Sequence, residues 1–409
     1  MPEGNVMIVQ RSHRILLQPN NKQRTAFSRW VGAYRWAYNW GLEQRKTTYE
    51  QEGKSLSKYD VQKLLTIEKH TPERDWLNDI LRDTLVNAIW DMDRAYQNFF
   101  RRVKSGEAKK GFPRFKSRRT ARRVFHITAA LVQLSEDRRS IRLPKLGWVR
   151  MTKALRLEGK MVSTVAISEE SGRWYASIVV KAEVPDPPDR SDDPAAGIDV
   201  GIKTLMTLSD GTQYQNPKAT YALEKRLARA QRQQSRRQKG SNRWKGAKRR
   251  VQRIHKRIKD VRVNAAHQAT QQVARNYGLV AMEDLNVKGM VKNRHLAKAV
   301  SDSNFHRLRQ QLTYKTAWSG SELRLVDRWF PSSKLCSVCG CINDDLVLAD
   351  RNWTCDCGAT HDRDVNAAKN ILAAAMRTTD ESAVAGRGGI GFSSPPDEAP
   401  SGRQEAANA

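Results

Sequence analysis

All five cysteines lie between residues 336 and 357, and the spacing of the four that form two pairs constrains the fold more than any other feature. Cys336 and Cys339 form one pair, and Cys355 and Cys357 form a second pair further along. A glycine follows each pair, so that a turn can bring four thiolates together in the tetrahedral arrangement that structural zinc requires. The spacing therefore predicts one structural zinc ion held by these four cysteines.

Two details of the pattern leave alternatives open. Cys341 lies beside the first pair and could replace one of the ligands, and the second pair is Cys-x-Cys, a tighter chelate than the common Cys-x-x-Cys. Disulfide bonds are the other interpretation of paired cysteines. The N-terminus lacks the apolar core of a secretion signal, and this favours a reducing compartment and therefore a metal.

The net charge points to a polyanionic partner. The chain has 73 Lys and Arg against 43 Asp and Glu, a formal charge of +30. An excess of this size is typical of proteins that bind nucleic acid. No apolar run reaches the roughly 20 residues of a membrane span, so we expect no membrane partner and a cytoplasmic, non-secreted protein. Residues 221–262 form a helical region, broken near Gly240, whose nearly uniform positive charge would repel itself unless phosphates neutralise it.

The periodicity of apolar residues changes along the chain. Residues 6–19 alternate weakly and predict a strand, whereas residues 22–103 carry two helical stripes that we interpret as the core of a helical bundle. Strand patterns return between residues 122 and 180, in the segments RVFHITA, SIRLPKLGWVRM, VSTVAIS and WYASIVV, and the last two of these predict a hairpin around Gly172. The first strand and these later strands suggest a small β-barrel into which the helices are inserted.

Beyond a Pro- and Asp-rich linker, three acidic residues lie at the ends of predicted elements. Asp199 sits between glycines in an apolar strand, Glu283 ends another apolar strand, and Asp364 opens the last helix. A carboxylate in such surroundings is costly unless a cation compensates its charge. Three of them could converge on Mg²⁺, and two ions about 4 Å apart would support phosphodiester hydrolysis. The alternative for any single acid is a helix cap or an ion pair, which Asp284 and Asp362 illustrate.

The remaining motif searches leave no rival catalyst. His361, next to the acids, is interpreted as structural, although it could also orient a metal-bound water or support a ligand. The chain contains no Ser/His/Asp pattern, Walker phosphate loop, dinucleotide fingerprint or HNH-type cluster.

Several segments together resemble the TnpB family of transposon-encoded, RNA-guided DNA endonucleases, which are related to compact type V CRISPR nucleases. They are GIDVGIKTLMTLSDG, AMEDLNVKGM, FPSSKLCSVCG, CGATHDRDVNAAKNI and, upstream, GFPRFKSRR. The resemblance implies a RuvC-like nuclease of the RNase H-like fold with Asp199, Glu283 and Asp364 as its catalytic, metal-binding triad. It favours Asp364 over Asp362, because Asp364 lies two residues before Asn366. It also implies that the cysteine segment is the family's zinc-binding insertion.

The resemblance further implies the partners and the reaction. A guide RNA from the transposon end would direct the protein to double-stranded DNA beside a short target-adjacent motif, and one site would cut it with two Mg²⁺ ions, for which Mn²⁺ could substitute. The prokaryotic cytoplasm, near the nucleoid, is the expected location, and the oligomeric state is left open. A non-cleaving guided repressor and a transposition accessory protein are the alternatives. The expected nucleic-acid contacts are Arg114, Phe115, Lys116, Arg118, Arg119, Arg236, Arg237, Arg249 and Arg250.

These inferences define a multidomain α+β protein with an N-terminal wedge-type β-barrel and a RuvC-like α/β nuclease. The predicted boundaries are 1–21 and 119–182 for the barrel, 22–118 for the inserted helices, 183–194 for the linker, 195–332 and 360–376 for the nuclease, 333–359 for the zinc ribbon and 377–409 for a disordered tail.

Overall fold

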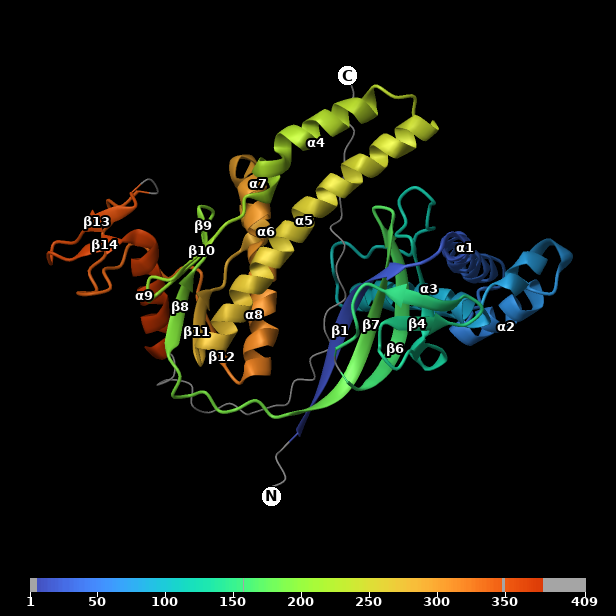
Figure 1. The fold of residues 1–409 in the computed structure, drawn as a ribbon, viewed down its shortest axis with the longest axis horizontal. Coiled ribbons are helices and arrows are strands. Elements are labelled where there is room, and N and C mark those ends of the chain that lie inside the picture. The colour runs from blue at the N-terminus through green and yellow to red at the C-terminus, as the bar shows by residue number, and fades with distance from the viewer. Residues whose placement is uncertain (1–5, 157, 348–349, 378–409) are drawn as a thin grey trace. The chain divides into compact units, whose positions relative to one another are not determined.

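A computed structural model describes residues 6–156, 158–347 and 350–377 of the chain. These residues form two compact units, 6–184 and 185–377, drawn in Figure 1. The predicted tail, apart from Arg377, lies outside the described residues. Among the described residues, no helix has the length and apolar character that crossing a bilayer requires.

The first unit contains a seven-stranded sheet. Its strand order is β2-β6-β7-β1-β5-β4-β3, and the pairs β2–β6, β6–β7, β1–β5, β5–β4 and β4–β3 are antiparallel. The predicted hairpin around Gly172 is confirmed as β6 and β7. The strands are β1 (Val6–Gln18), β2 (Val124–Thr128), β3 (Gln133–Leu134), β4 (Ser140–Leu143), β5 (Gly147–Met151), β6 (Lys160–Glu170) and β7 (Arg173–Pro185).

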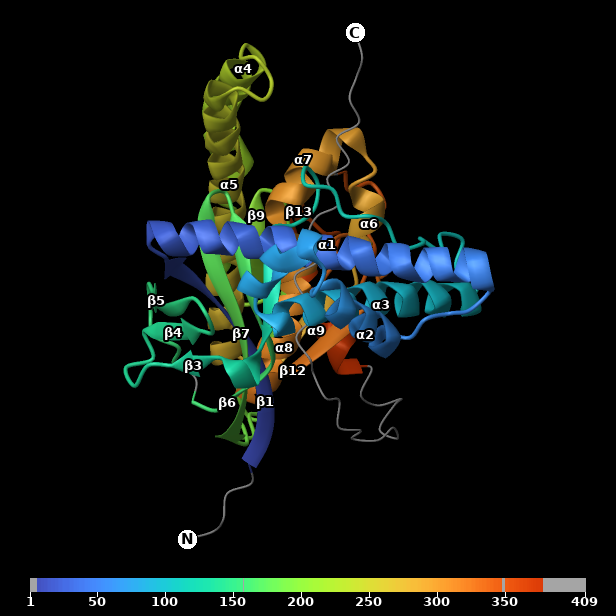
Figure 2. The same cartoon turned by 90° about the vertical axis from the view of Figure 1, so that its right-hand side faces the viewer.

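The helical bundle of this unit is confirmed between β1 and β2. The Asn20 side chain accepts a hydrogen bond from Gln23 N, and the Gln23 side chain accepts one from Asn20 N, so a capping box begins the first helix. Figure 2 shows that this helix continues without a break. The helices are α1 (Asn21–Glu52), α2 (Lys58–Glu68), η1 (Pro72–Asp79), α3 (Arg82–Lys104) and the short η2 (Ala129–Leu131).

One strand prediction in this unit is wrong. The segment SIRLPKLGWVRM, expected as a single strand, forms two antiparallel strands, β4 and β5, joined by a tight turn. Lys145 adopts a φ of 62° and Leu146 N donates to Leu143 O at 3.0 Å, which closes the turn. A positive φ is rare for lysine, so the residue type at position 145 did not predict this turn.

The second unit is built on a five-stranded mixed sheet in the order β10-β9-β8-β11-β12. Strand β8 pairs in parallel with β11, and β11 with β12, whereas β8–β9 and β9–β10 are antiparallel. The strands are β8 (Ala195–Asp199), β9 (Thr204–Leu208), β10 (Gln213–Gln215), β11 (Leu279–Glu283) and β12 (Glu322–Val326).

Helices surround this sheet and extend from it. The predicted basic region forms α4 (Ala219–Ser235) and the long α5 (Asn242–Asn276), which pack together as a hairpin over a narrow apolar seam and project beyond the sheet (Figure 1). The last helix, α9 (Arg363–Arg377), packs on β8. The other helices are α6 (Val287–Met290), α7 (Arg294–Ser303) and α8 (Phe305–Ser319).

Hydrogen bonds from Arg190 hold the C-terminal part of the predicted linker in place. Arg190 donates to the carbonyl oxygens of Ala274 and Arg275, both at 2.7 Å, and its Nε bonds Asp193 at 2.6 Å. These bonds cap the carbonyl end of α5 and hold residues 190–193 against the second unit.

Candidate active site and metal centre

The three predicted acids lie at one edge of the five-stranded sheet. Asp199 is the last residue of β8 and Glu283 is the last residue of β11. The two strands are parallel neighbours, and Met282 is paired with Ile198, so the two carboxylates follow at equivalent positions. The carboxyl ends of parallel strands are where open α/β sheets bind their ligands.

Helix α9 brings the third acid to this edge through an unusually close contact with β8. A Cβ atom added to Gly197 would lie 2.0 Å from the carbonyl oxygen of Ala368, so only glycine allows the helix to approach this closely. Asp199 lies two residues after Gly197 on the same face of the strand, and Asp364 lies one helical turn before Ala368. The contact therefore places Asp364 beside Asp199.

The electrostatics of the edge confirm that the three carboxylates interact. Burial, followed by the charges of Asp364 and Glu283, raises the pKa of Asp199 to about 7, although Arg363 and Arg351 oppose the rise. Burial also raises the pKa of Glu283, and a hydrogen bond from Ser332 opposes that shift. A buried carboxylate whose pKa is raised by neighbouring carboxylates favours a bound cation, because the charge of the cation offsets their repulsion.

Glu283 and Asp364 have hydrogen-bonding neighbours that the sequence did not suggest. Ser332 Oγ donates to Glu283 Oε1 at 2.5 Å, and Arg351 Nη1 lies 3.3 Å from Asp364 Oδ1. Asn370 Nδ2 donates to Ser332 O at 2.8 Å. A bonded path therefore runs from the middle of α9 through Ser332 to the carboxylate of Glu283.

The two neighbouring acids have the structural roles that we considered for them. Asp362 Oδ1 accepts a bond of 2.9 Å from Val365 N at the start of α9. Asp284 forms ion pairs with Arg309 and, at 2.7 Å, with Arg328. Their carboxylates are thus engaged in a helix cap and in ion pairs.

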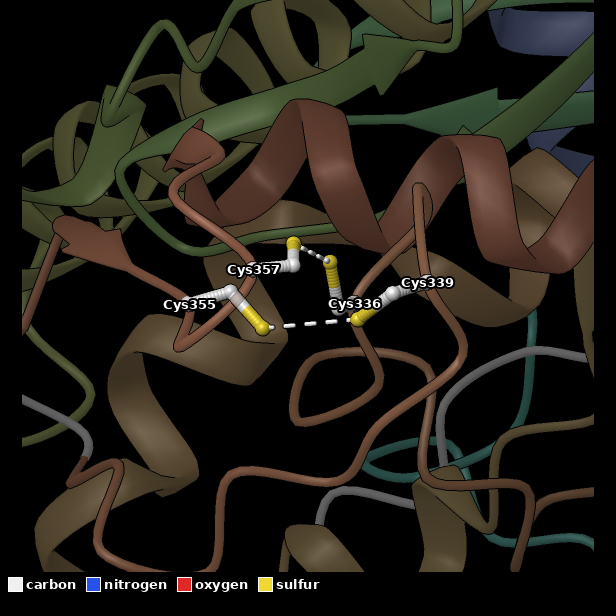
Figure 3. Close-up of side chains that lie close together, drawn as sticks. All are labelled: Cys336, Cys339, Cys355 and Cys357. Carbon is white, nitrogen blue, oxygen red and sulfur yellow. Dashed lines mark hydrogen bonds between the residues drawn. The ribbon is translucent and has the colours of Figure 1, made fainter.

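The four predicted cysteine ligands converge in the structure (Figure 3). All four sulfur atoms lie within 4.8 Å of one another, with Cys336 and Cys357 3.8 Å apart and Cys339 and Cys355 3.5 Å apart. Four sulfurs at about 2.3 Å from a tetrahedral zinc would be about 3.8 Å apart, so the cluster fits this ion. Within the part of the chain that the structure describes, no other group of His, Cys, Asp or Glu brings three ligand atoms this close.

The structure also places the two uncertain residues of this segment. Cys341 is exposed and is not part of the cluster. His361 is buried, with its ring centroid 4.8 Å from that of Trp353 and its Nε2 3.1 Å from Cys336 Sγ. His361 lies in β14 (Thr360–Asp362), which pairs with β13 (Asn352–Thr354) to form the small sheet of the ribbon.

The cysteine segment is bonded directly to the helix that carries Asp364. The side-chain amides of Asn366 and Asn370 both donate to Leu335 O, at 2.7 and 2.6 Å, and Asn366 Oδ1 accepts from Ser337 N at 3.0 Å. Leu335 and Ser337 flank Cys336, so the cluster fixes a loop against the first two turns of α9. The cysteine cluster therefore supports the position of the helix that carries Asp364.

Zinc content tests this assignment. We expect the purified protein to contain about one zinc per chain, and Cys336→Ser to lose it because three thiolates bind much more weakly than four. Elemental analysis after gel filtration measures the content. Cys341→Ser is the matched control and should keep its zinc, and loss of zinc in that variant would assign Cys341 as a ligand instead.

The predicted nucleic-acid contacts of the first unit lie in residues 114–119, which we call the clamped segment because hydrogen bonds with Asn39 hold its backbone. Asn39 bonds both the N–H and the C=O of Lys116, at 2.7 and 3.0 Å, and the Lys116 ammonium lies 3.5 Å from the ring centroid of Tyr38. Burial lowers the pKa of Lys116. Phe115 is 55% exposed, and the side chains of Arg114, Arg118 and Arg119 are also exposed.

The predicted contacts of the second unit lie on the α4–α5 hairpin. Arg236 and Arg237 follow α4, and Arg249 and Arg250 lie on α5, all four being exposed. The apolar residues of the hairpin are confined to its seam, which leaves the outer surfaces to basic side chains.

Comparison with known proteins identifies the family. The chain is 38% identical over 90% of its length to a Streptomyces pristinaespiralis protein named "Putative RNA-guided DNA endonuclease", of which it covers 90%. It is 33% identical over 88% of its length to the Escherichia coli (strain K12) protein "Putative RNA-guided DNA endonuclease InsQ", again covering 90%. The chain belongs to the TnpB family.

Family descriptions match successive parts of this TnpB-family chain. "Probable transposase" (OrfB of IS605) matches residues 177–294, which include Asp199 and Glu283, and "Cas12f1-like, TNB domain" matches residues 305–371, which include the cysteines and Asp364. "Helix-turn-helix domain" matches residues 7–54. The structure shows strand β1 and the single helix α1 over that last range, in place of two helices joined by a turn.

A solved structure shares the overall fold. A chain from "Cryo-EM structure of the Cas12f1-sgRNA-target DNA complex" superposes with a TM-score of 0.51, covering 89% of this TnpB-family chain and 99% of that chain. The two sequences are 13% identical, so the likeness concerns the fold alone.

Proposed function

We propose that this TnpB-family protein is an RNA-guided DNA endonuclease that hydrolyses phosphodiester bonds at Asp199, Glu283 and Asp364. The observation that carries the proposal is the convergence of these acids, from three separate elements, at one sheet edge, where burial and then the charges of Asp364 and Glu283 raise the pKa of Asp199 to about 7. The names of the relatives support the choice of DNA and of an RNA guide.

The chain's residues have distinct tasks in the proposed reaction. Two Mg²⁺ ions, or Mn²⁺ in their place, supply the activated water and stabilise the leaving 3′ oxygen when bound. Asp199, which is beside Asp364 and level with Glu283, would hold the ions together with these two acids. Ser332 orients Glu283 and Arg351 lies beside Asp364, so both carboxylates are held before the cations arrive.

The fold supports this assignment in finer detail. The mixed five-stranded sheet, with α9 packed on its central strand, supports an RNase H-like, RuvC-type nuclease. In the other unit, residues from strands at both ends of the seven-stranded sheet share one core, which supports the proposed wedge-type barrel.

The proposed partners follow from charge and from the relatives. We assign the basic hairpin α4–α5 and the clamped segment around Phe115 to the guide RNA and the target DNA, including its target-adjacent motif. Contacts to phosphates position a nucleic acid without reading its sequence, and this suits a protein whose guide supplies the specificity.

Guided cleavage tests the proposal directly. The protein is co-expressed with its flanking non-coding transcript and incubated with a plasmid library that carries randomised sequence beside a guide match. We expect Mg²⁺-dependent cleavage only where guide and target match, detected by sequencing the new ends. Tight, guide-dependent binding without cleavage in either Mg²⁺ or Mn²⁺ would instead support a non-cleaving repressor.

A further inference from the structure

Trp329, in the turn after β12, is the most exposed tryptophan of the chain. Its side chain is 85% exposed, whereas Trp148, the next most exposed, reaches 49%. A single exposed aromatic residue is common on protein surfaces, so exposure alone assigns no role. The position of this residue relative to the acids is what distinguishes it.

The turn that carries Trp329 is fastened to the catalytic edge on both sides. Before it, Arg328 Nη2 donates to Asp284 Oδ2 at 2.7 Å, and after it, Ser332 Oγ donates to Glu283 at 2.5 Å. Phe330, the next residue, packs into the apolar cluster of Ala281, Val326 and Ile371. Trp329 N itself donates to Asp327 Oδ1 at 2.8 Å.

This anchoring fixes the backbone while it leaves the indole in solvent. Phe330 points into the core, and the neighbouring Trp329 makes no aromatic or cation–π contact among the described residues. The indole therefore stands on a rigid support one short turn from Glu283. An aromatic ring held in this way can bind a partner with little loss of conformational entropy.

The cavity beside this turn has the charge that a nucleic-acid strand requires. Its lining includes the carboxylate of Glu283 together with the side chains of Lys288, His306, Arg309 and Arg328. Basic side chains around a catalytic carboxylate suit the phosphates that flank a scissile bond. Trp329 directly follows Arg328, so a strand whose phosphate lies at Arg328 has a base within reach of the indole.

We propose that Trp329 stacks on a base of the DNA strand next to the scissile phosphate and thereby positions that phosphate over the three acids. This inference rests on the proposed nuclease function and adds a substrate-positioning residue to it. Stacking on an aromatic ring accepts every base, because every base has a π face. The contact therefore suits an enzyme that must cut whatever sequence its guide selects.

A fluorescent base tests the contact without relying on cleavage. Target DNA carries 2-aminopurine at successive positions around the mapped cut site and is bound by the guide complex of Asp199→Asn, which should bind without cutting. We expect the fluorescence to be quenched at one or two positions by stacking on the indole. The quenching should be lost in Asp199→Asn/Trp329→Ala and largely kept in Asp199→Asn/Trp329→Phe.

Cleavage by the single variants provides the second measurement. Trp329→Ala should slow single-turnover cleavage by roughly tenfold, in the range of one stacked base, and Trp329→Phe should restore most of the rate. Because the indole is exposed, Trp329→Ala should change the thermal unfolding midpoint by less than about 2 °C. Trp148→Ala controls for loss of an exposed indole and should leave the 2-aminopurine signal unchanged.

The outcomes separate this inference from the proposed function. If the wild-type complex cuts guided DNA but Trp329→Ala changes neither the quenching nor the rate, the stacking contact is refuted and the nuclease stands. If the wild-type complex cuts no guided DNA, the proposed function fails before any tryptophan is changed, and this inference fails with it.

Discussion

Asp199→Asn should reduce guided DNA cleavage by at least about 1000-fold while leaving guide and target binding nearly unchanged. The substitution keeps the size of the side chain and removes the carboxylate that interacts with Asp364 and Glu283. Binding is expected to survive because the basic hairpin and the clamped segment lie on other elements. Single-turnover cleavage and a filter-binding titration with the same complex measure the two effects.

The matched control is Glu322→Gln, which removes an acid from the same sheet. Glu322 begins β12, at the end of the strand opposite the catalytic edge, and pairs with Arg324 at 2.8 Å. Its loss should leave the cleavage rate within about twofold, as expected of an exposed ion pair. Full cleavage by Asp199→Asn would remove Asp199 from the proposed mechanism.

Asp199→Asn should also stabilise the metal-free protein, by an amount that depends on pH. The folded-state pKa of Asp199 is about 7, above its ordinary value of 3.8, so the folded state retains a proton that the unfolded state releases. Stability is therefore lost as pH rises from about 4 to about 7, by at most about 4 kcal/mol, and the loss persists at higher pH. Thermal unfolding in Mg²⁺-free buffer should show that Asp199→Asn gains more stability at pH 8 than at pH 5.

Gly197→Ala should destabilise the second unit by about 3 kcal/mol or more and abolish cleavage. The new methyl group would meet the carbonyl oxygen of Ala368 at 2.0 Å, and this main-chain atom cannot rotate away as a side chain can. Helix α9 must therefore move off β8, and it carries Asp364 with it. Chemical denaturation reports the stability, and the cleavage assay reports the displacement of the acid.

Gly246→Ala provides the matched control for this change. Gly246 lies within α5, and a Cβ atom added there would have no neighbour within 4 Å. Alanine favours a helix over glycine by about 1 kcal/mol, so this variant should be as stable as the wild type or slightly more so. Equal stability of the two alanine variants would contradict the close packing of α9 on β8.

The sequence was sufficient for features that depend on local pattern. Apolar alternation predicted the hairpin β6–β7, and the cysteine spacing predicted the cluster. Its four sulfur atoms lie within 4.8 Å of one another, with Cys339 and Cys355 3.5 Å apart. The resemblance to the TnpB family chose Asp364 over Asp362, and the structure places Asp362 in a helix cap. The roles of Asp199, Glu283 and Asp364 in catalysis stay predictions, as do those of the nucleic-acid contacts.

Other features depend on contacts between distant segments and left no local signal. Ser332 supports Glu283 across 49 positions in sequence, and Asn370 reaches Leu335 across 35. A serine in a loop and an asparagine in a helix have many structural uses, so neither residue type indicates such a role alone. The turn at Lys145 was missed for a related reason, because its left-handed backbone is imposed by the pairing of β4 with β5.

The three acids occur far apart along the chain, and Asp364 is made last. A polypeptide released early, or trimmed by a protease before α9, would keep the basic hairpin and the first two acids but could not assemble the third. Under the proposed function, such a fragment would bind nucleic acid but could not cut it. The position of Asp364 near the end of the chain therefore predicts that translation products lacking α9 are inactive as nucleases.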